Sequence, residues 1–149
     1  MPIYHEETEF DKKILEMSPD FCMLYREAET AEAGGLSKIC GTGYRKALEF
    51  LIKDFVISFT LAGRPDAEKD KVKQMGLAAC IGGYITNEKI KLAAERAVWL
   101  GNDQTHYTQL WEDKDLTDLK RLVNMTVSYI RLELDAAEYM KDMPRGKHT

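Results

Sequence analysis

Residues 36–59, LSKICGTGYRKALEFLIKDFVISF, decide the fold of this chain. Their apolar side chains recur every three or four positions, which is the period of one face of an α-helix. This stripe consists of Leu36, Ile39, Cys40, Gly43, Tyr44, Ala47, Leu48, Leu51, Ile52, Phe55 and Phe59. Polar residues such as Glu49 and Lys53 fall largely off the stripe and are expected to face solvent. The segment therefore predicts one long amphipathic helix.

Three small residues on this helix, Gly41, Gly43 and Ala47, predict where another helix packs against it. A glycine inside a helix costs roughly 1 kcal/mol relative to alanine. The close approach of a neighbouring helix is a physical reason for a chain to accept that cost. We therefore expect a close helix–helix contact at this surface.

The segment before this helix carries clear start and stop signals. Residues 18–20, Ser-Pro-Asp, predict a helix start with the Ser18 hydroxyl as N-cap and proline in the first turn. The glycine pair 34–35 predicts the end of that helix. Residues 1–17 are expected to form an N-terminal arm or a short helix that opens near Thr8.

The segment after the central helix is less regular. Residues 67–75 predict a charged, solvated piece of helix, and residues 77–85 predict a buried segment whose form the pattern leaves open. Thr86 or Asn87 is expected to cap a further helix. Gly101 is the natural residue to end it, because glycine readily adopts the left-handed conformation that follows many helices.

The last predicted helix is the longest. Asp115 is a good N-cap and Pro144 a stop, and about 28 residues between them would extend roughly 42 Å. Its expected inward stripe is Leu119, Leu122, Val123, Thr126, Val127, Ile130, Leu134, Ala137 and Met140. A helix of this length is expected either to project beyond the core or to pair with a second copy of the chain.

These elements predict an all-α fold, a bundle of four to five helices with a long C-terminal helix. No stretch shows the two-residue alternation of a half-buried strand. We expect one domain over residues 18–143, preceded by the arm 1–17 and followed by a short tail, 144–149.

Composition limits the classes of function. The net charge of −4 argues against an extended nucleic-acid surface but leaves room for a local basic pocket. Three widely spaced cysteines are expected to be buried free thiols in a reducing compartment. No leader pattern and no apolar run long enough to cross a membrane is visible, so we expect a cytoplasmic protein. No pair of metal-ligating residues has a metal-site spacing, so neither a metal nor a cofactor is expected.

The stretch Arg96–His106, RAVWLGNDQTH, is the candidate functional segment. Polar side chains follow the expected helix end at once, and loops on rigid scaffolds often carry function. His106 is a candidate general acid or base, because histidine is the residue type most often used for proton transfer near neutral pH, and Asp103, three residues before it, is its candidate orienting partner. The structural alternative is that His106, Asp103 and Asn102 only cap the helix and the following turn.

Two arginines are candidate anion ligands. Arg45 either pairs with Glu49, four residues on along the same helix face, or points at the Asn102–His106 loop and forms an anion site with it. Arg96 is either such a ligand or a cation near a helix C-terminus. The aromatic residues Trp99, Tyr107 and Trp111 flank the loop, and they serve either as core and rim residues or as a stacking platform for a nucleotide.

Three blocks of sequence carry a resemblance to a known family: residues 18–28, residues 43–54 and residues 101–106. In this order and separation they resemble the bacterial domain-of-unknown-function family numbered forty-one forty-five. That family is placed in the HEPN superfamily of helical bundles, whose name stands for higher eukaryotes and prokaryotes nucleotide-binding. The resemblance covers roughly residues 18–140.

The resemblance implies a helical bundle that is often dimeric and occurs alone or fused to restriction or defence proteins. Some HEPN members are metal-independent ribonucleases whose motif is an arginine, four to six residues, and then a histidine. His106 matches the histidine, but the arginine positions hold Trp99, Leu100 and Gly101.

The absent arginine favours a non-catalytic function over cleavage. The leading hypothesis is a homodimeric or protein-binding module that binds a nucleotide or an RNA phosphate near Arg45, Asn102 and His106. The alternative is a divergent metal-independent ribonuclease of toxin or phage-defence type. In that alternative His106 is the acid or base, and Arg45 or Arg96 stabilises the charge that develops on the phosphate.

Overall fold

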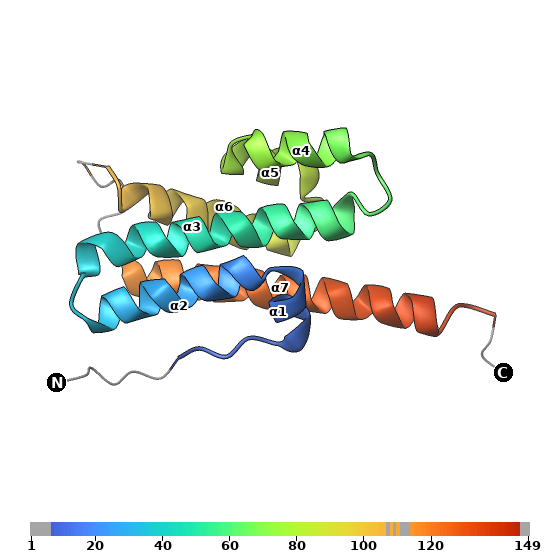
Figure 1. Cartoon of the computed structure of the whole chain (residues 1–149), viewed down its shortest axis with the longest axis horizontal. Coiled ribbons are helices and arrows are strands. Elements are labelled where there is room, and N and C mark those ends of the chain that lie inside the picture. The colour runs from blue at the N-terminus through green and yellow to red at the C-terminus, as the bar shows by residue number, and fades with distance from the viewer. Residues whose placement is uncertain (1–6, 107, 109, 111–113, 147–149) are drawn as a thin grey trace.

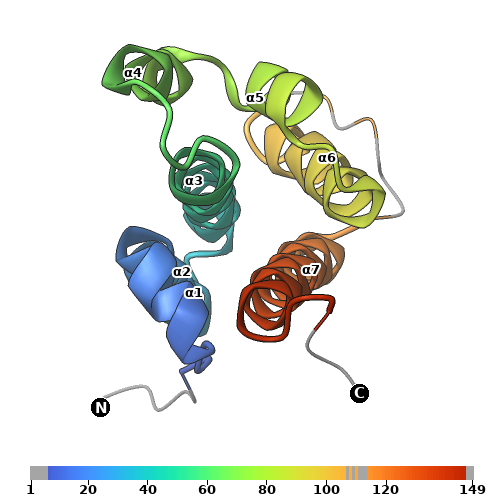
Figure 2. The same ribbon diagram turned by 90° about the vertical axis from the view of Figure 1, so that its right-hand side faces the viewer.

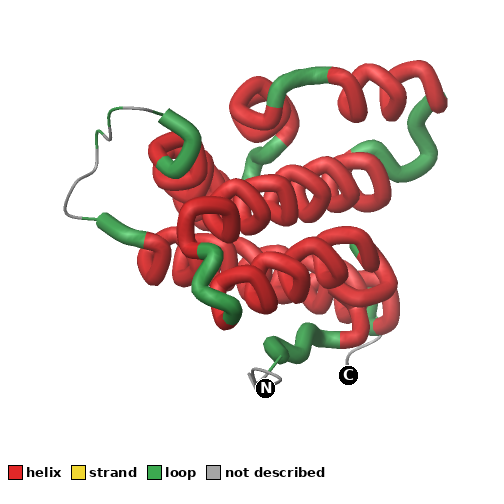
Figure 3. Tube along the Cα trace, turned by 60° about the vertical axis from the view of Figure 1, so that its left-hand side comes forward, coloured by secondary structure: helices red, strands yellow, loops and turns green. Residues whose placement is uncertain are grey.

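The computed structural model describes residues 7–106, 108, 110 and 114–146. These residues form helices and loops without a strand, so the all-α prediction is confirmed (Figure 3). The elements are α1 (Lys12–Met17), α2 (Pro19–Ala33), α3 (Ser37–Phe55), the π-helical turn η1 (Val56–Thr60), α4 (Asp66–Gln74), α5 (Leu77–Tyr84), α6 (Glu88–Asp103) and α7 (Leu116–Asp142). The described part of the chain has seven α-helices rather than four or five, because three short segments are helical as well.

Four long helices form the body of the molecule. Figure 2, which looks along the bundle, shows α2, α3, α6 and α7 side by side, with α4 and α5 lying over the end of α3 and the flank of α6. Most of the predicted stripe of α3 faces this core, where Tyr44, Leu48 and Leu51 are fully buried, but its first members, Leu36 and Ile39, are exposed. Lys13 of α1 forms ion pairs with Asp135 and Glu138, and these tie α1 to α7.

The small residues of α3 lie where neighbouring helices approach, as the sequence predicted. A Cβ atom on Gly43 would lie 3.1 Å from the Cβ of Ala28 in α2. A Cβ atom on Gly41 would lie 2.6 Å from the side chain of Gln104, just beyond α6. A side chain at position 43 would therefore crowd α2, whereas one at position 41 would require the flexible Gln104 side chain to move aside.

Most of the predicted caps are confirmed. The Asn87 side chain accepts hydrogen bonds from the first turn of α6, and Asp115 and Asp118 form a reciprocal capping box at the start of α7. Gly35 adopts a positive φ of 82° after α2. Ser18 occupies the N-cap position of α2, but its hydroxyl donates to Asp54 Oδ2, 2.5 Å away, and forms no capping hydrogen bond.

Two predicted helix bounds are wrong. Helix α1 begins at Lys12, with Asp11 as its N-cap, and not near Thr8. Helix α6 does not stop at Gly101 but continues to Asp103, and Gly101 has no positive φ. Gly101 is needed for the approach of another side chain, described below, and not for a helix end.

Helix α7 projects beyond the bundle (Figure 1). Its inner positions Leu119, Val123, Thr126 and Ile130 are buried, as predicted. Met140 was expected on the same face, but 76% of it is exposed, because the helix has by then passed the end of the core. Among the described residues, no helix has the length and apolar composition that a membrane span requires.

Candidate functional site

Arg45 of α3 and Asn102 of α6 lie in direct contact. The Arg45 Nε donates a hydrogen bond to Asn102 Oδ1 at 2.8 Å. The stem of Arg45 crosses α6 at Gly101, where an added Cβ would lie 2.8 Å from Arg45 Cγ and 2.9 Å from its Cβ. Arg45 Nη1 is also 3.6 Å from Glu49 Oε1, so the predicted pairing with Glu49 is present. Arg45 also reaches Asn102, which lies inside α6 and not in a loop, and the predicted anion site stays a prediction.

Glu49 also contacts Lys53, so Arg45, Glu49 and Lys53 form a polar row along α3. Glu49 Oε2 lies 3.0 Å from Lys53 Nζ, one helical turn further along α3. Lys53 was expected to face solvent, but it is buried, and its ammonium donates to the backbone oxygens of Lys73 and Met75 at 3.1 and 2.7 Å. The row therefore fastens the C-terminal end of α4 to α3, which is a structural role for Glu49.

Asp103 is the last residue of α6 and His106 follows three residues later, and the two side chains differ in burial. Asp103 is buried, and its Oδ1 accepts a hydrogen bond of 3.2 Å from the Leu110 backbone N–H. His106 is exposed, and its backbone N–H donates to the Asn102 oxygen at 3.2 Å. No hydrogen bond joins the His106 side chain to either candidate arginine in the described part of the chain. His106 instead lines a shallow hollow of about 390 Å³ together with Trp99, Asn102, Asp103 and Leu110, so three of the predicted site residues share this hollow.

A second hollow lies on the other side of Trp99, between α6 and α7. We call it the Trp99 groove; its volume is about 340 Å³. Its lining residues are Arg96, Trp99, Leu100, Lys114, Asp118, Arg121, Leu122 and Met125. Arg96 lies over the Trp99 ring, with its guanidinium carbon 5.1 Å from the ring centroid, and its Nη1 donates to the Leu92 oxygen.

The Trp99 groove combines an apolar floor with positive charge at its rim. The charged residues that line the groove are three cations, Arg96, Lys114 and Arg121, and one carboxylate, Asp118. The Asp118 carboxylate already accepts a hydrogen bond from the Asp115 N–H in the capping box. Such a surface suits a ligand with one flat apolar part and one anionic part.

The sequence identified only part of this groove. Arg96 and Trp99 were singled out because they lie in the candidate segment, whereas Lys114, Arg121 and Met125 were not. Their membership depends on how α7 packs against α6, which no local sequence signal reveals. Tyr107, Trp111, His5 and His148 lie outside the described residues.

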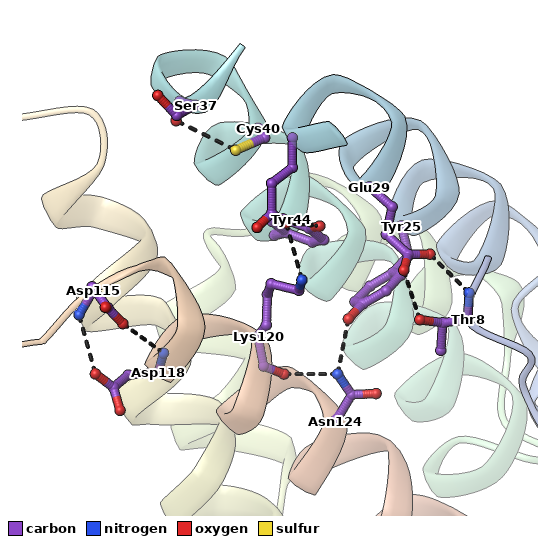
Figure 4. A network of polar contacts seen from close by, with 11 residues as sticks. Thr8, Tyr25, Glu29, Ser37, Cys40, Tyr44, Asp115, Asp118, Lys120 and Asn124 are labelled. Atoms are coloured by element: carbon purple, nitrogen blue, oxygen red, sulfur yellow. Dashed lines mark hydrogen bonds and ion pairs between the residues drawn. The ribbon is translucent and has the colours of Figure 1, made fainter. Parts of the chain in front are cut away.

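A separate cluster of polar side chains joins α2, α3 and α7, and no sequence pattern indicated it (Figure 4). The Tyr44 hydroxyl donates to Glu32 Oε1 at 2.7 Å, and Lys120 Nζ donates to the same oxygen at 3.0 Å. Asn124 Nδ2 donates to the Tyr25 hydroxyl at 2.9 Å. Burial and the hydrogen bond to Glu32 raise the pKa of Tyr44, so this phenol stays protonated and holds the helices together.

Within the residues that the structure describes, no group of three or more His, Cys, Asp or Glu side chains is placed to hold a metal ion. The three cysteines are buried free thiols, as predicted. No family model, curated protein or solved structure matches this chain. The resemblance to the HEPN superfamily therefore has no support from these comparisons, whereas the all-helical bundle follows from the structure itself.

Proposed function

We propose that this chain is a non-catalytic helical module of HEPN type that binds a nucleotide or an RNA phosphate in the Trp99 groove, and that it acts as a homodimer or with a protein partner. The observation that carries the proposal is the charge of the groove. Arg96, Lys114 and Arg121 surround an apolar floor on a protein whose net charge is −4. A basic site on an acidic protein attracts an anion locally, without the broad basic surface of a general nucleic-acid binder.

The shape of the groove supports a small ligand. Its volume of about 340 Å³ is at the lower end of the range for ligand sites, which suits one nucleotide or the last nucleotide of an RNA. Trp99 is 41% exposed, and Leu122 and Met125 lie across from it on α7. A nucleobase would contact these side chains while its phosphate meets Arg96 or Arg121.

The non-catalytic part of the proposal is supported by the surroundings of the candidate catalytic groups. Asp103 accepts a hydrogen bond from the Leu110 N–H, and Arg45 is held by Asn102 and Glu49. His106 lines the adjoining hollow with Asn102 and Asp103, and none of the described residues that line this hollow is an arginine. An arginine beside the histidine is what the cleavage of a phosphodiester would need, because it stabilises the charge that develops on the phosphate.

A fluorescence titration tests this proposal. The chain has two tryptophans, so Trp111→Phe leaves Trp99 as the sole reporter. We expect saturable quenching by adenosine monophosphate or by a short RNA with a terminal phosphate. In this background Arg121→Gln should weaken binding about tenfold, which corresponds to roughly 1.4 kcal/mol. The binding should also weaken as salt is raised.

The matched control is Arg64→Gln, which removes the same charge from the loop between η1 and α4, at the other end of α3 (Figure 1). If Arg64→Gln weakens binding as much as Arg121→Gln, the effect is one of net charge and the proposed site is wrong. If neither ligand changes the fluorescence at millimolar concentration, the groove is not a nucleotide site. Cleavage of RNA in the presence of EDTA, lost in His106→Ala, would establish the ribonuclease alternative instead.

A further inference from the structure

Helix α7 carries a second apolar row besides the one that faces the core. The row consists of Leu122, Met125, Tyr129, Leu132, Ala136 and Tyr139, and we call it the outer row. Successive members are three and four residues apart in strict alternation, which is the heptad spacing of a helix that pairs with another helix. The core-facing residues, such as Val123 and Ile130, lie on the neighbouring face.

The bundle covers only part of the outer row, because Leu122 and Tyr129 pack partly against the core whereas Leu132, Ala136 and Tyr139 are exposed. Leu132 is 54% exposed and Tyr139 is 66% exposed. Figure 1 shows the C-terminal part of α7 extending past the other helices, and α1 contacts this part where Lys13 pairs with Asp135 and Glu138. An exposed apolar row at heptad spacing on a projecting helix indicates a surface that packs against another helix.

We infer that a second copy of this chain packs along the outer row, with the two α7 helices antiparallel. The inference gives the homodimer part of the proposed function, on which it rests, a specific surface. In the antiparallel register Leu122 meets Tyr139 of the second copy, Met125 meets its Ala136, and Tyr129 meets its Leu132. Each large side chain opposite a smaller one makes a layer that fills space well.

The charges beside the outer row favour this direction. Arg121 and Asp142 lie on the same flank, three heptads apart. Neither forms an ion pair with another described residue of its own chain. Antiparallel packing brings Arg121 to Asp142 of the second copy, and the two-fold axis makes this pair occur twice. Parallel packing would set Ala136 against Ala136 and would leave Arg121 without a carboxylate opposite it.

The same surface serves both copies, so the assembly closes as a dimer and does not grow further. The core of each bundle lies behind its own α7, on the side of Leu119 and Val123. The two bundles therefore lie on opposite sides of the paired helices.

The first experiment measures the oligomeric state of the nucleotide-free chain by sedimentation equilibrium. We expect a dimer for the wild type and a monomer for Leu132→Glu, because the change would bury a carboxylate against Tyr129 of the second copy, twice near the centre of the interface. Leu132 is exposed in the single chain, so this change should leave the circular dichroism spectrum unaltered. The matched control is Met23→Glu on α2, which is 51% exposed and should remain a dimer.

A charge exchange tests the antiparallel direction. Arg121→Asp and Asp142→Arg should each weaken dimerisation about tenfold, because each places like charges at both ends of the interface. The double variant Arg121→Asp/Asp142→Arg should restore the wild-type dissociation constant. A wild type that stays monomeric at 0.1 mM, or a double variant that is not restored, overturns the inference. Because no nucleotide is present, either result leaves the proposed ligand site untouched.

Discussion

Gly101 is the residue on which the contact between α3 and α6 depends. It lies inside α6, and the stem of Arg45 occupies the space where any other residue would place its Cβ. The near end of the arginine side chain cannot move aside without displacing α3. Arg45 reaches Asn102 because this position has no side chain.

We therefore expect Gly101→Ala to lower the free energy of unfolding by about 1–3 kcal/mol, the usual cost of overpacking a well-filled site. Urea denaturation measures this change. The control is Gly82→Ala in α5, where an added Cβ meets nothing within 4 Å. Because alanine favours a helix over glycine, the control should be unchanged or more stable by up to about 1 kcal/mol. Equal effects of the two changes would contradict the role given to Gly101.

Local signals explain which residues could be predicted. Asn87, Asp115 and the glycine pair 34–35 act through hydrogen bonds and backbone angles within a few residues of themselves, so the sequence alone reveals them. Gly101 was misread because a glycine at a helix end and a glycine under a crossing side chain look the same in sequence. Lys53 was misread because its partners are backbone oxygens 20 and 22 residues away.

At the scale of elements, Glu32 of α2 joins three helices. It accepts hydrogen bonds from Tyr44 of α3 and Lys120 of α7. Burial raises the pKa of Glu32, but the two hydrogen bonds and the charge of Lys120 outweigh burial, so the pKa lies below its usual value of 4.5. The cluster escaped prediction because its members come from helices whose relative rotation the sequence does not specify.

This pKa shift predicts acid sensitivity. Between the pKa of Glu32 in the folded protein and 4.5, the unfolded chain binds the extra proton, so stability rises with pH in that window. The contribution of Glu32 is present above about pH 4.5 and is lost as the pH falls further. We expect Glu32→Gln to lower the melting temperature at pH 7. The difference in melting temperature between this variant and the wild type should shrink as the pH falls below about 4.5. An equal difference from wild type at pH 7 and pH 3 would contradict the role of the ionised carboxylate.

At the scale of the whole molecule, the Trp99 groove and the outer row share part of α7. Leu122 and Met125 line the groove and also belong to the row, and Arg121 lies at the rim of both. Most helices could be predicted one by one, although the sequence leaves open the form of residues 77–85, where α5 lies. The length of α7 predicted that it either projects beyond the core or pairs with a second copy, and it projects. The overlap of two surfaces could not be predicted, because it depends on which face of α7 meets α6.

This overlap predicts that the ligand and the second copy compete. Arg121 cannot pair with a phosphate and with Asp142 of the second copy at once, and the paired helix would cover Met125. Saturating adenosine monophosphate should therefore raise the dissociation constant of the dimer in sedimentation experiments. By thermodynamic linkage, the dimer should bind the nucleotide more weakly by the same factor.

The variant Leu132→Glu separates the two effects, because Leu132 does not line the groove. As a monomer it should bind adenosine monophosphate at least as tightly as the wild type, with an affinity that does not change with protein concentration. The wild type should bind more weakly as its concentration rises and dimers form. If the nucleotide binds but leaves the dimer dissociation constant unchanged, the two surfaces are independent and Arg121 serves only one of them.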